Sequence, residues 1–304
     1  MSTPSLSVDP LWPRAGDWPS VDELAGGERA DLALIGIPTW RTSLSATGAH
    51  ATPAAVRAAL RRYSPHAEGV EVESLRLVDA GDVAEPDGSE GEARATAAMR
   101  SAVARATVTV AVGGDNALTV PAALGAYGDE LPSAGLITLD AHHDLRDGVS
   151  NGSPVRRLVE AGLAGTRVVQ IGIADFANSA AYTRRAADLG ITVITRDALH
   201  RRPLDDVLAE ALEIAGAAGG PVHVDLDVDV CDRSVAPGCP ASVPGGLAAW
   251  ELRRVARLAA ASPLVRSLDI AEVDATADAA DERTVRLAAL LVLEAAAGVA
   301  SRTS

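Results

Sequence analysis

Short apolar runs alternate with longer segments rich in Ala, Leu and Arg along this 304-residue chain. The apolar runs are rich in β-branched residues, which is typical of strands buried on both faces of a parallel sheet. The candidate strands are residues 31–37, 75–79, 107–112, 135–140, 168–173, 191–195, 222–229 and 265–272. The candidate helices are residues 52–62, 91–105, 117–126, 154–163, 179–189, 204–217, 248–260 and 282–300. This alternation predicts an α/β fold with helices on both faces of the sheet.

Eight β–α units also fit a closed (β/α)₈ barrel, so the number of strands does not by itself distinguish an open sheet from a barrel. No linker-like stretch divides the chain. We therefore expect one domain over residues 1–304, in which residues 1–30 form an irregular N-terminal segment.

The composition excludes several classes of protein. The net charge is −14 and no basic run exceeds two Arg residues, which argues against a nucleic-acid-binding surface. All 27 basic residues are Arg, so Schiff-base chemistry and a P-loop lysine are excluded. The apolar segment 287–300 carries Glu294 and is shorter than the ~20 residues of a membrane span. The N-terminus shows no export signal, and Cys231 and Cys239 cannot form a disulfide framework, so we expect a cytoplasmic protein.

Three carboxylates, Asp225, Asp227 and Asp229, stand at alternate positions near the end of the candidate strand 222–229. Side chains two residues apart share one face of a strand, so the three carboxylates would point the same way. Like charges this close repel each other, and an apolar strand solvates them poorly. A divalent cation would resolve the conflict.

Other candidate strands also end in polar residues. Asp115 and Asn116 follow one strand, the segment 140–144 follows a second, and Glu272 follows a third. Because ligands of parallel α/β folds gather at the carboxyl ends of the strands, these residues would converge. In the segment 140–144, Asp140, His142 and Asp144 are spaced so that one strand end could aim all three at one point.

Together with Asp227 and Asp229, these residues supply four carboxylates and one imidazole, which suits Mn²⁺ better than Zn²⁺. The excess negative charge favours two ions, which at ~3.5–4 Å separation could activate a water. His143 is expected to point away from His142. The other histidines, expected on the surface or in the core, are His50, His66, His200 and His223.

These residues resemble the motifs of the ureohydrolase superfamily, which comprises arginases, agmatinases and formimidoylglutamases. The matching segments are Gly113-Gly114-Asp115-Asn116, Asp140-Ala141-His142-His143-Asp144, Asp227-Val228-Asp229 with Asp232 and Ala236-Pro237-Gly238, and Ala271-Glu272-Val273-Asp274. The resemblance covers nearly the whole chain. It implies a three-layer α/β/α fold with an eight-stranded, mostly parallel sheet, a binuclear manganese centre, and assembly into homotrimers or hexamers.

The resemblance also implies a role for each matching residue. Asp140 and Asp227 would bridge two ions; His142 and Asp229 would complete the site of one ion, and Asp144 that of the other. Asn116 would be a further metal ligand. Glu272 would pair with the planar cationic group of the substrate, and Asp115 would support the site from behind. Glu272, Asp115 and Asp144 are thus the predicted catalytic residues. Asp225 stands where the family usually has Ser, so we expect it beneath the ligands rather than among them.

Two residues depart from the family pattern. Asn116 stands where the family usually has a metal-binding His, and an amide oxygen is a weaker ligand than imidazole, so that ion would be held weakly. Asn151 lies where arginases and agmatinases carry a His, and Asn151 cannot shuttle protons. These differences argue against an ordinary arginase or agmatinase, or for lost activity.

The segments Asp144-Leu145-Arg146 and Asn151-Gly152-Ser153-Pro154 look most like formimidoylglutamases. Formimidoylglutamate carries two carboxylates that need Arg partners, whereas agmatine carries none. The predicted substrate-binding residues are Arg146, Asn151, Ser153 and Glu272, with Arg41, Arg156 and Arg157 on flanking loops. Arg146 could instead form a salt bridge with Asp144 or Asp147.

The sequence therefore predicts a manganese hydrolase that converts N-formimidoyl-L-glutamate and water into L-glutamate and formamide during histidine breakdown. One alternative is an agmatinase or another enzyme that hydrolyses a guanidino compound. A second alternative is a metal-poor binding homologue without activity. A small molecule is the expected partner in all three cases, with no role for nucleic acid or a membrane.

Overall fold

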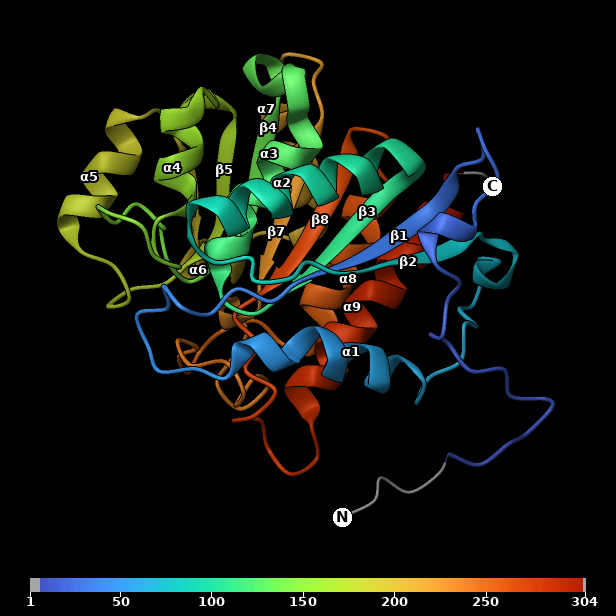
Figure 1. Ribbon diagram of the computed structural model, residues 1–304. Coiled ribbons are helices and arrows are strands. Elements are labelled where there is room, and N and C mark those ends of the chain that lie inside the picture. The colour runs from blue at the N-terminus through green and yellow to red at the C-terminus, as the bar shows by residue number, and fades with distance from the viewer. Residues whose placement is uncertain (1–5, 303–304) are drawn as a thin grey trace.

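The computed structural model describes residues 6–302, and its centre is a sheet of eight strands (Figure 1). The strands are β1 (Ala30–Ile37), β2 (Leu77–Asp82), β3 (Ala106–Gly113), β4 (Gly135–Leu139), β5 (Val168–Ile173), β6 (Thr192–Thr195), β7 (Val222–Asp227) and β8 (Val265–Ala271). Their order is β2-β1-β3-β8-β7-β4-β5-β6, and every adjacent pair is parallel. The predicted parallel sheet is confirmed. The barrel alternative is wrong, because β2 and β6 form two open edges.

Helices cover both faces of this sheet, which confirms the predicted three layers (Figure 1). The helices are α1 (Thr52–Leu60), α2 (Gly88–Arg105), α3 (Thr119–Tyr127), α4 (Pro154–Ala161), α5 (Ala180–Asp188), α6 (Arg196–Leu199), α7 (Leu204–Ala215), α8 (Ala249–Ala261) and α9 (Arg283–Ala300). Helices α1, α7, α8 and α9 share one hydrophobic core with the sheet, and α2, α3, α4 and α5 pack on the other face. Among the described residues, none of these helices is both long and apolar enough to cross a bilayer.

The face of the central strands that is turned toward α3 carries buried polar residues. His223 of β7 contacts Ser267 Oγ through Nδ1 (2.7 Å) and Asp269 Oδ2 through Nε2 (3.0 Å). His223 is fully buried, as expected for a core histidine whose ring nitrogens have partners. Asp225, two residues further along β7, pairs in register with Asp269 of β8 and is also buried.

The strand order decides where the predicted site residues meet. The chain builds β1, β2 and β3 on one side of the sheet and β4, β5 and β6 on the other, and β8 and β7 later fill the space between β3 and β4. The four central strands, β3, β8, β7 and β4, therefore lie side by side. Because they are parallel, the segments that follow them emerge at one edge of the sheet, where such folds bind ligands.

Candidate metal and substrate site

Three side chains meet at the carboxyl ends of β4 and β7, namely Asp140, His142 and Asp229. Their potential ligand atoms all lie within 4.8 Å of one another. His142 Nδ1 is 2.7 Å from Asp229 Oδ2 and 3.4 Å from Asp140 Oδ1. The backbone fixes this arrangement, because the amide of Ala141 donates to Asp229 Oδ1 (2.9 Å) and that of His142 to Asp140 Oδ1 (2.6 Å).

The local conformations that produce this arrangement differ from the predicted strand ends. Strand β7 ends at Asp227, and Val228–Val230 forms a 3₁₀ turn, which the Asp227 carboxylate caps by accepting from the amide of Asp229 (2.8 Å). The expectation that Asp229 shares a strand face with Asp225 and Asp227 is therefore wrong. Strand β4 likewise ends at Leu139, so Asp140–Asp144 is a loop, and Asp144 has a left-handed backbone (φ 53°).

The charges in this cluster are poorly compensated. Burial, together with the nearby charges of Asp144 and Asp229, raises the pKa of Asp140 well above its usual value. Burial and the charge of Asp229 do the same to the pKa of Asp227. Burial opposes protonation of His142, but Asp229 and Asp140 outweigh it and raise the pKa of His142 to about 12.

A cation fits this donor set. Asp140 Oδ2 is buried and has no hydrogen-bond partner among the described residues. A buried carboxylate oxygen without a donor is costly, and a coordinated ion is one of the few ways to satisfy it. The mixture of carboxylates and one imidazole suits a hard or borderline divalent ion.

Asn116 begins the 3₁₀ turn before α3 and forms hydrogen bonds with Asp144 and Glu272. Its Nδ2 donates to Asp144 Oδ2 (2.6 Å), and its Oδ1 accepts from the Thr119 hydroxyl (2.6 Å). The amide thus presents N–H, not oxygen, to Asp144. A Thr hydroxyl can accept as well as donate, so a reversed amide would keep its contact with Thr119 while offering oxygen to an ion.

Glu272 follows β8 and is held by two neighbours in a left-handed backbone conformation (φ 58°). Its Oε1 accepts from the backbone amide of Asn116 (2.9 Å) and from the side-chain Nδ2 of Asn151 (2.7 Å). Within the described residues both hydrogen bonds reach Oε1, which leaves Oε2 for a ligand. Burial raises the pKa of Glu272 to about 8. A left-handed backbone at a residue other than Gly is strained, and such strain gathers at functional sites, here at Asp144 and Glu272.

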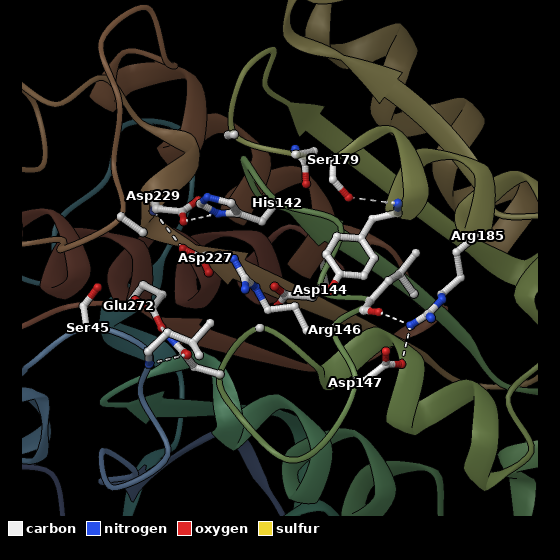
Figure 2. Close-up of a pocket in the computed structure, with 18 of the residues that line it drawn as sticks. Ser45, His142, Asp144, Arg146, Asp147, Ser179, Arg185, Asp227, Asp229 and Glu272 are labelled. Atoms are coloured by element: carbon white, nitrogen blue, oxygen red, sulfur yellow. Dashed lines mark hydrogen bonds and ion pairs between the residues drawn. The ribbon is translucent and has the colours of Figure 1, made fainter.

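These residues line a cavity of about 710 Å³ (Figure 2). Arg146 is an exposed residue on its wall and forms no ion pair with any residue that the structure describes. The alternative salt bridge of Arg146 with Asp147 is not formed, since Asp147 pairs with Arg185 (2.8 Å). The cavity-lining residues that carry the predicted site are His142, Asp144, Arg146, Asn151, Asp227, Asp229 and Glu272.

Four predicted site residues do not line the cavity, namely Asn116, Asp140, Asp115 and Ser153. Asn116 and Asp140 are buried and form hydrogen bonds with the lining residues Asp144 and His142. Ser153 is buried, and its hydroxyl closes a turn by donating to the Ser150 carbonyl (2.8 Å) and accepting from the Ser150 amide (3.0 Å). Asp115 is also buried, accepts from the Ala117 amide (3.2 Å), and has its pKa raised to about 6 by burial. The nearby charge of Asp115 adds to burial in raising the pKa of Glu272.

The flanking cations differ from those expected. Arg156 pairs with Glu160, and Arg157 with Glu92 (2.7 Å), so neither faces the cavity. The wall instead includes residues that the sequence did not single out. These are Ser45, Phe176, Asn178, Ser179, Tyr182 and Arg185. They lie on loops and on α5 without a motif of their own, and only the folded structure brings them to the site.

Comparison with known proteins agrees with this architecture. The arginase family profile matches residues 30–298. The formimidoylglutamase of Halalkalibacterium halodurans is 35% identical over 279 residues, which covers 88% of this chain and 87% of that protein.

Two solved structures share the fold over nearly the whole chain. The formimidoylglutamase of Bacillus subtilis superposes with a TM-score of 0.89 at 30% identity, covering 99% of this chain and 96% of that one. The formiminoglutamase of Trypanosoma cruzi, solved with Mn²⁺, superposes with a TM-score of 0.83 at 26% identity, covering 94% and 100%. The predicted resemblance is confirmed, and the chain belongs to the arginase family.

Proposed function

We propose that this protein hydrolyses the formimidoyl C–N bond of N-formimidoyl-L-glutamate, giving L-glutamate and formamide. The observation that carries the proposal is the charge pattern of one cavity. Asp227, Asp229 and Glu272 line it beside the buried Asp140, and its wall presents Arg146, which forms no ion pair with any described residue. A substrate with a cationic amidine at one end and carboxylates beyond it matches both features. The similar formimidoylglutamases of H. halodurans and B. subtilis support the same substrate.

We also propose that two Mn²⁺ ions are held by Asp140, His142, Asp144, Asp227 and Asp229, with Asn116 as a weak additional ligand. A divalent ion supplies a Lewis acid and lowers the pKa of a water held at the site. Mn²⁺ in the T. cruzi relative supports the choice of metal.

The protein's own residues then orient the reacting group. We assign Glu272 Oε2 to the planar amidinium, because a carboxylate and a planar cation form strong, directional hydrogen bonds. The side chain of Asn151 and the backbone amide of Asn116 hold Oε1, so the carboxylate cannot rotate freely. Asn151 therefore positions Glu272 instead of carrying a proton, which accounts for an amide where related hydrolases have a histidine.

Two alternatives are tested against this proposal. Agmatine would place an ammonium beside Arg146, and like charges repel. One observation favours a metal-poor binding protein. The side-chain amide of Asn116 donates to Asp144 instead of offering its oxygen to an ion.

A substrate panel with Mn²⁺ titration separates the three. We expect glutamate release from formimidoylglutamate that rises with added Mn²⁺. Urea release from agmatine with no glutamate release from formimidoylglutamate would replace the proposal by an agmatinase. Metal content well below two ions per chain, with no turnover of either compound, would favour the binding protein.

We further propose a cytoplasmic homo-oligomer, a trimer or a hexamer, as the family resemblance implies. Light scattering of the purified protein tests the assembly, and a monomer at micromolar concentration would refute it.

A further inference from the structure

Arg185 lies on the cavity wall but has no part in the reaction described above. It projects from the second half of α5, and its Nη1 donates to the Leu145 carbonyl (2.6 Å) and to Asp147 Oδ1 (2.8 Å). Its guanidinium carbon lies 5.5 Å from the centre of the Tyr182 ring, close enough for a cation–π contact. Within the described residues every hydrogen bond of its side chain uses Nη1, so the other guanidinium nitrogens remain available.

The charged residues are unevenly distributed along the cavity. Figure 2 shows Glu272, Asp229 and His142 toward one end of the group, Arg185 and Asp147 toward the other, and Asp144 and Arg146 between them. An amidine carbon that reacts at the acidic end leaves the remainder of its molecule to extend past Arg146 toward Arg185. Two guanidinium groups along that path favour an anionic tail.

We propose that Arg185 is a specificity-determining residue that binds the distal carboxylate of a dicarboxylic substrate, while Arg146 binds the carboxylate nearer the amidine. This inference rests on the proposed function and names the residue that would distinguish substrates with a distal carboxylate from those without one. The Leu145 carbonyl holds the guanidinium in place, so little side-chain freedom is lost when substrate binds.

Asp147 is the internal competitor for this position. Its side chain is 81% exposed, so a substrate carboxylate can replace it at Arg185 without stranding a buried charge. The pair Arg185–Asp147 thus keeps the guanidinium paired in the free protein and releases it on binding.

Kinetics of Arg185→Gln test the proposal. For N-formimidoyl-L-glutamate we expect KM to rise about 10- to 100-fold with kcat little changed, since one hydrogen-bonded charge is lost in both ground and transition states. For N-formimidoyl-L-norvaline, which lacks the distal carboxylate, we expect the same KM in both proteins. Arg184→Gln, an exposed neighbour on α5 outside the cavity, is the matched control. An equal change on both substrates, an equal change in the control, or no change in Arg185→Gln would overturn the role of Arg185.

A binding measurement separates this inference from the proposed function. We expect calorimetry to show that glutarate, a dicarboxylate without an amidine, binds the wild-type protein and Arg184→Gln, binds Arg185→Gln about 10- to 100-fold more weakly, and binds Asp147→Asn more tightly. Arg185-dependent glutarate binding without turnover of formimidoylglutamate would refute the proposed function and leave the dicarboxylate site standing. Turnover of formimidoylglutamate together with an affinity for glutarate that is the same in wild type and Arg185→Gln would refute the inference alone.

Discussion

Replacing Glu272 by Gln removes the carboxylate that would pair with the cationic amidine and keeps the shape of the side chain. Oε1 of Glu272 is occupied by Asn116 and Asn151, so the substrate is left with Oε2. A hydrogen bond to a charged group contributes about 1.5–3 kcal/mol. Because 1.4 kcal/mol is a factor of ten, Glu272→Gln should lower kcat/KM for formimidoylglutamate by about 10- to 150-fold.

The assay is the initial rate of glutamate release at saturating Mn²⁺, with metal content and melting temperature measured on the same samples. Glu282→Gln is the matched control, because Glu282 also has a left-handed backbone (φ 56°) but is exposed and pairs with Arg62 outside the cavity. A kcat/KM within twofold of wild type would refute the pairing of Glu272 with the amidine. A loss of activity that parallels a loss of Mn²⁺ would instead assign Glu272 to metal retention.

Three further changes test the metal site and a loop beside it. Asn116→His should raise Mn²⁺ affinity in a metal titration, since imidazole is the better ligand; unchanged affinity would mean that residue 116 is not a ligand. Chelation of Mn²⁺ from protein held at 100 times Kd should lower the free energy of unfolding in urea by about 2.7 kcal/mol, and an unchanged midpoint would contradict binding to the folded state. Burial opposes ionisation of Asp274, but hydrogen bonds from Thr276 and the Gly48 amide outweigh it and lower its pKa. Its stabilisation is therefore complete above the unfolded pKa of ~3.9 and is lost as pH falls through the lower folded value, so the unfolding free energies of wild type and Asp274→Asn should converge in acid; a gap independent of pH would refute this.

The sequence predicted the sheet well because buried parallel strands need continuous apolar runs, and each of the eight runs became a strand. It also predicted which polar segments meet, because the carboxyl ends of parallel strands share an edge. The local geometry was beyond it. Asp229 reaches the cluster through a 3₁₀ turn, and Asp144 and Glu272 through left-handed backbones. Strand alternation cannot describe these conformations, which depend on contacts with distant segments.

Side chains that act through long-range pairing were also hard to predict. Arg156 and Arg157 stand beside the proposed substrate loop in sequence, yet Glu160 and Glu92 bind them and turn them away. Helix α4 and strand β5 separate Arg185 in sequence from the loop Asp140–Asp144, and only the packing of α5 beside that segment brings Arg185 to Asp147. Proximity in sequence is therefore a poor guide to which arginine lines the cavity.

The distribution of charged residues along the cavity also indicates which residues would determine substrate preference. Formimidoylglutamate is cationic at the amidine and anionic beyond it, and agmatine is cationic at both ends. Both compounds would satisfy the acidic end equally, so Asp140, Asp229 and Glu272 cannot distinguish them. In the proposed binding mode, discrimination comes from Arg146 and Arg185 on the cavity wall, which would attract a carboxylate and repel an ammonium. We therefore predict that a change of preference toward agmatine requires the loss of these arginines, whereas changes among the proposed metal ligands would alter the rate on every substrate alike.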